Sequence, residues 1–105
     1  MTRLTITYVV SSDSSERLHL AKQLVTEKVR PECVHEDIGE AKDRVYVEHR
    51  KVGDYFSSVQ IADDGPTSFR VVFEPCPNAD RYWKDLVVHV LASLRDSGLL
   101  IRYVR

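Results

Sequence analysis

The sequence contains 105 residues, of which 43% are hydrophobic and 30% are charged, and its formal net charge is −1. This length predicts a single domain, residues 1–105, because domains most often contain about 100–150 residues. A near-neutral chain gives no broad electrostatic case for binding nucleic acid or an anionic membrane. The apolar runs are far shorter than the roughly 20 residues that span a bilayer. We therefore expect no membrane association.

The cysteine content and the N-terminal segment bear on the compartment. Cys33 and Cys76 are the only cysteines, which is too few for a disulfide framework and favours a reducing environment. Residues 1–17 alternate apolar and polar side chains, and they lack the continuous apolar stretch of a signal peptide. Both observations predict a cytoplasmic protein.

A strand and then a helix are predicted at the start of the chain. Residues 3–10 follow a period-two pattern that is typical of a strand with one core face. The helix is expected over residues 14–29, where Asp13 and Glu16 have capping-box spacing. Pro31 cannot continue this helix. The positions expected to face the core are Leu4, Ile6, Tyr8 and Val10 on the strand and Leu18, Ala21, Val25 and Val29 on the helix, with Leu24 on its flank.

Residues 31–43 show no clear periodicity of apolar residues, and their acidic side chains outnumber their basic ones. We interpret this segment as an acidic loop, and its length favours a functional one because it exceeds the usual connection length. Its carboxylates, opposed by the single Lys42, are Glu32, Glu36, Asp37, Glu40 and Asp43.

Three strands are predicted next, over residues 44–50, 55–62 and 68–74. The turns that join them, 51–54 and 63–67, are short, so the strands are expected to form an antiparallel meander. The inward positions are expected to be Val45, Val47, His49, Tyr55, Ser57, Val59, Ile61, Phe69, Val71 and Phe73.

The chain is predicted to end with a helix and a strand. Asn78 is the expected N-cap of a helix that runs to about Ser97, and Gly98 stands where a left-handed C-terminal cap is expected. Residues 99–104 read as the last strand. The apolar stripe of this helix comprises Trp83, Leu86, Val87, Val90, Leu91 and Leu94.

The predicted element order is β-α-β-β-β-α-β, which makes the chain an α+β protein. One apolar stripe on each helix and alternation along the strands favour a largely antiparallel five-stranded sheet with both helices on one face. This is a ferredoxin-like plan with an extra strand. The sequence does not determine the order of strands in the sheet.

The usual signatures of catalysis and cofactor binding are weak. The first strand-to-helix turn has no glycine, so a phosphate-binding loop is not expected. Cys33, His35, Glu36 and Asp37 are crowded candidates for metal ligands without the paired spacing of a zinc site. We expect no cofactor and no metal, and we read Cys33 as a small hydrophobe that packs on the core.

The remaining histidines and aromatic residues fit structural roles. His49 is expected to be partly buried and hydrogen-bonded, and His19 to be exposed. Residues 68–74 lack the glycines and the leading basic residue of a sheet-face RNA motif, so RNA binding is not expected.

Two surfaces remain as candidate partner-binding sites. The first is the acidic segment 32–43, which offers carboxylates to a basic partner. The second is the outer sheet face, where tyrosine and arginine suit a protein interface, although such a face is also ordinary when its charges pair across strands. The candidate residues on this face are Arg44, Tyr46, Glu48, Arg50 and Arg70, with Glu74 beside them.

These observations predict a non-enzymatic module that binds a protein partner stoichiometrically, such as a toxin-immunity or inhibitor-type protein acting on a toxin or nuclease domain. One alternative is a ferredoxin-like domain that binds a small ligand or has a regulatory role. This alternative predicts a pocket between the helices and the sheet, and it allows a homo-oligomer. Another is a small enzyme that uses Cys33 with His35 or His49.

Overall fold

The computed structural model describes residues 5–41, 44–52, 56–76 and 83–104. Within these ranges six strands form one sheet, with two α-helices and one short 3₁₀ helix. The elements in chain order are β1 (Ile6–Ser11), α1 (Ser15–Val29), η1 (Arg30–Glu32), β2 (His35–Ala41), β3 (Arg44–Val52), β4 (Phe56–Asp63), β5 (Ser68–Pro75), α2 (Trp83–Asp96) and β6 (Leu100–Val104).

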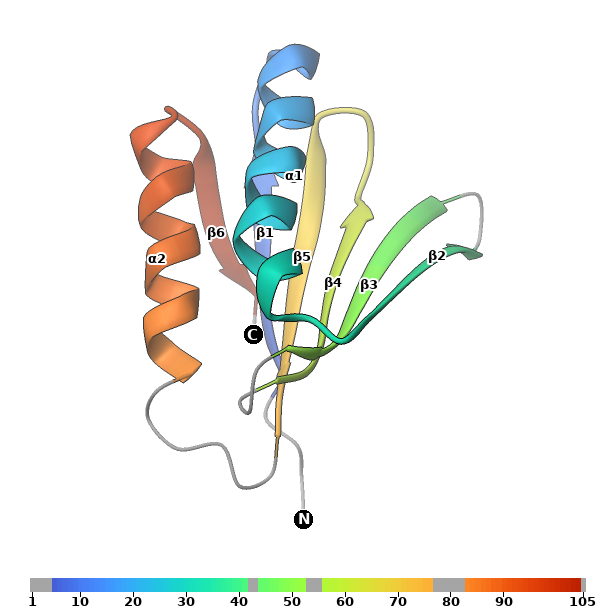
Figure 1. The fold of residues 1–105 in the computed structure, drawn as a ribbon. Helices are drawn as coiled ribbons and strands as arrows, with labels where there is room; N and C mark the ends of the chain where they lie inside the picture. The colour runs from blue at the N-terminus through green and yellow to red at the C-terminus, as the bar shows by residue number, and fades with distance from the viewer. Residues whose placement is uncertain (1–4, 42–43, 53–55, 77–82, 105) are drawn as a thin grey trace.

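The sheet has the strand order β2-β3-β4-β5-β1-β6, and every neighbouring pair is antiparallel. The first strand of the chain therefore lies between the last two. Both helices pack against the same face of the sheet, over the part that contains β1, β5 and β6 (Figure 1). The α+β class, the antiparallel meander and the helices on one face are confirmed.

The prediction of five strands is wrong, because residues 35–41 form β2 rather than part of a loop. This strand pairs with β3 along its whole length, from His35 opposite Arg50 to Ala41 opposite Arg44. Backbone pairing satisfies the polar groups of an acidic segment as well as those of an apolar one, so the negative charge did not prevent a strand. The ferredoxin-like plan stays a prediction.

Helix α1 buries the side chains that its sequence pattern assigned to the core, namely Leu18, Ala21, Val25 and Val29. Its N-cap is Ser14, whose hydroxyl accepts a hydrogen bond from the amide of Arg17 at 3.3 Å. The N-cap is therefore one residue later than the predicted Asp13, and Arg17 rather than Glu16 stands three residues after it. At the other end of the fold, Gly98 has a φ of 79°, the left-handed conformation expected after α2.

The core lies between the two helices and the inner face of the sheet. Phe69, Val71 and Phe73 of β5 are buried there as predicted. Val52 and Phe56 also reach the core, although strict alternation would turn Phe56 outward. The backbone is irregular at this corner, because Lys51 has a φ of 54° and the β4–β5 register shifts between Phe56 and Ser58. A bulge of this kind re-aims the neighbouring side chains.

The outer face of the sheet carries no helix, yet Val9 is only 4% exposed on it. Val9 lies opposite Arg70 of β5 and opposite Arg102 of β6. Long arginine side chains cover apolar surface with their aliphatic stems while the guanidinium stays in water, and this explains the burial. The alternation of residues 3–10 correctly leaves Val9 off the core face, but it does not reveal that Val9 is buried.

Candidate functional site

The tight turn between α1 and β2 determines where Arg30 and Cys33 lie. Pro31 is the second residue of the 3₁₀ helix η1, and the amide of Cys33 donates to the carbonyl of Arg30 at 3.1 Å. The next amide, of Val34, donates to the carbonyl of Arg50 on β3 at 3.1 Å. This turn therefore places Cys33 beside the inner face of the β2–β3 hairpin, where it packs against the core.

Cys33, Glu36 and His49 converge on this inner face, and we call them the Cys33–Glu36–His49 cluster. One donor atom from each residue lies within 4.8 Å of the other two. Glu36 and His49 face each other across the β2–β3 ladder, and His49 Nδ1 lies 3.4 Å from Glu36 Oε2. The cluster thus combines a thiol, a carboxylate and an imidazole.

His49 is the unusual member, because its side chain is 0% exposed and neither ring nitrogen has a hydrogen-bond partner among the described residues. The contact with Glu36 is short enough for an ion pair but lacks hydrogen-bonding geometry. Burial lowers the pKa of His49 below its usual value of 6.5, against the opposing attraction of Glu36. The predicted inward position is confirmed, whereas the predicted hydrogen bond is absent.

Arg30 holds the Glu36 carboxylate from the solvent side. Its Nε donates to Oε2 at 2.9 Å and its Nη2 donates to Oε1 at 3.2 Å. The hydrogen bond from Arg30 lowers the pKa of Glu36, and the same bond raises the pKa of Arg30. Glu36 is therefore ionised at neutral pH, and its carboxylate contacts both the Arg30 guanidinium and the His49 ring.

The four residues considered as crowded ligands, residues 33, 35, 36 and 37, are separated by the alternation of β2. Glu36 joins Cys33 on the inner face, whereas His35 and Asp37 lie on the outer face and contact each other at 2.9 Å. Two of the four predicted ligand candidates, Cys33 and Glu36, therefore belong to the cluster, whereas its third member, His49, was considered from the sequence only as a partly buried residue or a catalytic partner of Cys33.

The outer face of β2–β4 carries a network of paired polar groups. Arg50 contacts Asp37 at 3.1 Å and Glu48 at 3.3 Å, and Gln60 donates to Glu48 at 3.3 Å. This is the cross-strand pairing that is common on a solvated sheet face.

The other candidate partner-binding residues have different outcomes. Arg70 lies in the same register row as Tyr46, two strands away, and contacts Asp64 at 2.9 Å. Residue Asp43 and the side chains of Glu32, Glu40, Arg44 and Tyr46 lie outside the described part of the structure.

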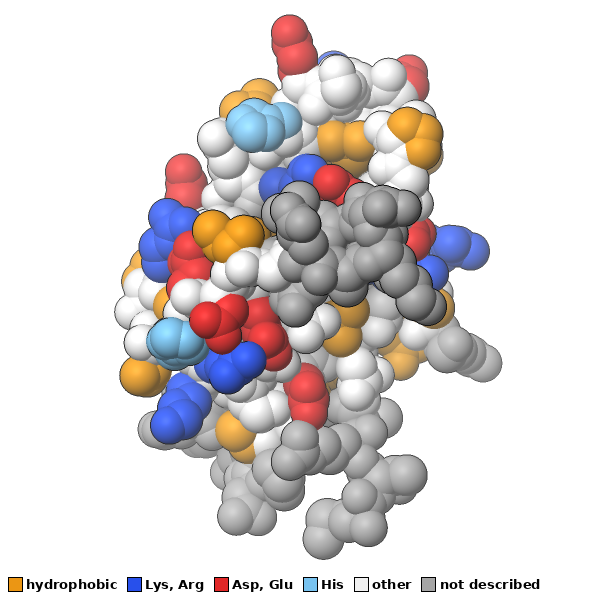
Figure 2. All heavy atoms as spheres, turned by 90° about the vertical axis from the view of Figure 1, so that its right-hand side faces the viewer, with side chains coloured by type: hydrophobic (Ala, Val, Ile, Leu, Met, Phe, Trp, Pro, Cys, Tyr) orange, Lys and Arg blue, Asp and Glu red, His pale blue; other side chains and the backbone are white. Residues whose placement is uncertain are grey.

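Strand β2 is one edge of the sheet, so one side of its backbone has no neighbouring strand in the described structure. Two large hydrophobic side chains are exposed beside this edge, Val34 at 75% and Ile38 at 72%. Figure 2 views this side of the molecule and shows hydrophobic, acidic and basic side chains close together on it. The edge is therefore apolar in places and acidic in others.

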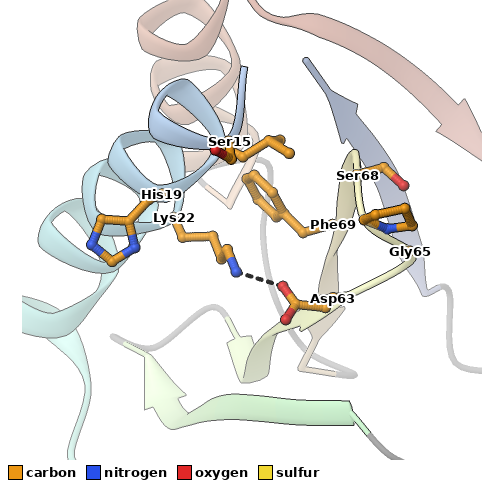
Figure 3. A pocket seen from close by; sticks show the side chains of 9 residues that line it. Ser15, His19, Lys22, Asp63, Gly65, Ser68 and Phe69 are labelled. Atoms are coloured by element: carbon orange, nitrogen blue, oxygen red, sulfur yellow. Dashed lines mark hydrogen bonds and ion pairs between the residues drawn. The ribbon is translucent and has the colours of Figure 1, made fainter. Parts of the chain in front are cut away.

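A separate pocket of about 310 Å³ lies between α1 and the turn that joins β4 to β5. Ser15, His19 and Lys22 approach it from α1, and Asp63 and Phe69 from the strands (Figure 3). Lys22 and Asp63 form an ion pair at its wall. The two charges neutralise each other, so the pocket offers shape and hydroxyl groups more than net charge.

Arg30 is the residue that sequence reasoning overlooked, because a helix-terminal arginine before a proline is ordinary. The signal that was available is the alternation of residues 35–41, which places Glu36 and Ile38 on one side and His35 and Asp37 on the other. Reading that segment as a strand would have placed Glu36 in reach of His49.

No helix within the described residues is long and apolar enough to cross a membrane. No protein-family model, no curated protein and no solved structure matches the chain.

Proposed function

We propose that this protein binds another protein stoichiometrically, and that the binding surface is the outer edge of β2. The observation that supports the proposal is that this edge is regular over its whole length and carries carboxylates but no lysine. Natural edge strands are usually blunted by charged side chains, especially lysine, or by proline, bulges or a covering element. Strand β2 contains no lysine or proline and pairs with β3 over seven consecutive residues without a register shift.

The expected occupant is an extended, basic and partly apolar segment of the partner. An added strand gains main-chain hydrogen bonds along the edge, and exposed side chains such as Ile38 provide specificity. Strand β2 carries Glu36, Asp37 and Glu40 and no arginine or lysine. Arg30 and Arg50 already pair with Glu36 and Asp37, so positive side chains on the incoming segment would compete with these arginines for the carboxylates.

The same charges disfavour a second copy of this chain as the occupant. Antiparallel self-pairing centred on Ile38 would bring Glu36 of each copy opposite Glu40 of the other. Like charges directly opposite each other destabilise a strand pair. We therefore assign the edge to a different protein, of the kind that a cytoplasmic inhibitor or toxin-immunity protein binds when it occupies a basic, phosphate-binding site.

A matched pair of variants tests this proposal. Ile38→Lys introduces a positive charge on the β2 edge, and Leu100→Lys does the same on the opposite edge, where Leu100 is 75% exposed. Tagged wild-type protein and both variants are used to capture partners from the source cells, and the affinity of the partner is then measured with purified proteins. We expect Ile38→Lys to weaken binding at least about tenfold, since like charges across an interface are strongly unfavourable, while Leu100→Lys retains the wild-type affinity.

Equal affinity of the partner for wild type and Ile38→Lys would contradict the assignment of this edge. Recovery of a homo-oligomer with no stoichiometric partner would instead favour the second candidate function.

The second candidate is a ligand-binding domain, and the pocket beside α1 favours it. Its volume lies at the lower end of the range for small-molecule sites. In this reading β4-β5-β1-β6 is a ferredoxin-like nucleus to which the β2–β3 hairpin is added. A metabolite that raises the melting temperature of the wild type but not of Lys22→Met would support it.

A further inference from the structure

We propose that the Cys33–Glu36–His49 cluster is a binding site for a transition-metal dication, with Zn²⁺ as the ion that its donors suit best. The proposed metal site uses side chains on the inner face of the β2–β3 pair, whereas the proposed partner pairs with the backbone edge of β2, so this inference does not rest on the proposed function. Thiolate, imidazole and carboxylate are the three ligand types that zinc takes in proteins.

The geometry of the cluster is close to that of a three-ligand zinc site. Zinc–ligand distances of about 2.0–2.3 Å in a tetrahedron separate the ligand atoms by about 3.5 Å. The donor atoms of Cys33, Glu36 and His49 lie within 4.8 Å of one another, so an inward movement of about 1 Å brings them to bonding distance. Three protein ligands leave the fourth position for water.

His49 provides the independent sign that the site is built to receive something. A fully buried imidazole with no hydrogen-bond partner is costly, because its polar nitrogens have lost water without replacement. The Nδ1 atom already faces the Glu36 carboxylate at 3.4 Å. An ion bound between these two groups and Cys33 supplies the missing partner.

The charges and the access are also suitable. A Cys33 thiolate and the Glu36 carboxylate together balance a dication, and binding releases the thiol proton. Cys33 is half-buried and Glu36 is 26% exposed, whereas His49 lies fully buried beneath them, so the ion reaches His49 past the other two ligands. Arg30 is the competitor, because its guanidinium occupies both carboxylate oxygens, and its exposed side chain leaves when the ion enters.

The test is metal binding by the purified full chain, reduced with a thiol-free reductant and freed of metal. Zn²⁺ is titrated against a competing chelator, and Co²⁺ is used as a spectroscopic probe because a cobalt–thiolate bond produces a charge-transfer band. We expect one ion per chain, a Co²⁺ band that requires Cys33, and at least about a 100-fold loss of Zn²⁺ affinity in Cys33→Ser, since even outer-shell changes cost 10–100-fold.

Three further variants sharpen the test. Cys76→Ser removes the other thiol and retains wild-type affinity. His49→Leu removes the buried ligand without leaving a void and loses affinity. Arg30→Gln removes the competing cation and binds Zn²⁺ more tightly. Stoichiometric Zn²⁺ binding that survives in both Cys33→Ser and His49→Leu overturns the proposal. So does wild-type protein that binds Zn²⁺ no more tightly than these two variants.

Discussion

Replacement of His49 by leucine is expected to stabilise the metal-free protein. His49 is fully buried and neither of its nitrogens is hydrogen-bonded, and leaving a buried polar group without a partner costs about 1–3 kcal/mol. Leucine has a similar size, so the packing penalty stays below about 1.5 kcal/mol. The expected net gain is about 1 kcal/mol in the free energy of unfolding, or roughly 4–8 °C in melting temperature.

The measurement is denaturant unfolding at about pH 7.5, where a free histidine is neutral, in the presence of a chelator. His89→Leu, at an exposed position of α2, is the matched control and is expected to change stability by less than about 0.5 kcal/mol. A loss of more than about 1 kcal/mol in His49→Leu would refute the reasoning, because it would mean that the imidazole makes favourable interactions in the folded state.

The pH dependence of the same variant is a second readout. Burial lowers the pKa of His49 below 6.5 in the folded state, so the unfolded chain binds a proton first as the pH falls. Stability therefore declines as the pH decreases from about 6.5 toward the folded-state pKa. This decline is expected to be shallower in His49→Leu than in the wild type. Equal slopes in this window would show that His49 does not titrate as a buried group.

Four further predictions concern other parts of the molecule. Glu36→Gln removes a carboxylate whose pKa Arg30 holds below 4.5. The wild type loses the stability from this ionised group as the pH falls through the lowered pKa, and the variant should lack that loss. Acid unfolding of the two proteins is the measurement. Phe73→Ala, at a core position with 0% exposure, is expected to cost about 3–5 kcal/mol in urea unfolding. Gly98→Ala places a side chain at a φ of 79° and should cost about 1 kcal/mol. Lys22→Gln breaks an ion pair that is more than a third exposed and should change the unfolding free energy by less than about 1 kcal/mol.

The elements with strong periodicity were predictable from the sequence. The stripe of α1 and the alternation of β5 both matched the buried residues, because burial of one face is the dominant source of these patterns. The glycine after α2 was equally informative, since few other residues adopt a positive φ.

Features that depend on contacts between distant segments were not predictable. The described side chains of β2, residues 35–39, are all intermediate or exposed, so the strand has a weak pattern of polar and apolar positions. Phe56 enters the core through a local bulge, which alternation cannot reveal. The Cys33–Glu36–His49 cluster depends on the pairing register of β2 with β3, which the structure defines and which could not be predicted while residues 31–43 were interpreted as a loop.

The position of β1 has a consequence for the order of folding. Its two neighbours, β5 and β6, come from the C-terminal part of the sequence, whereas β2 to β5 are joined by short connections. On the ribosome, the first strand emerges long before either of its partners exists. The β2–β5 meander is therefore expected to form early through local contacts, and the insertion of β1 closes the sheet last, since distant pairings carry the larger loop-closure cost.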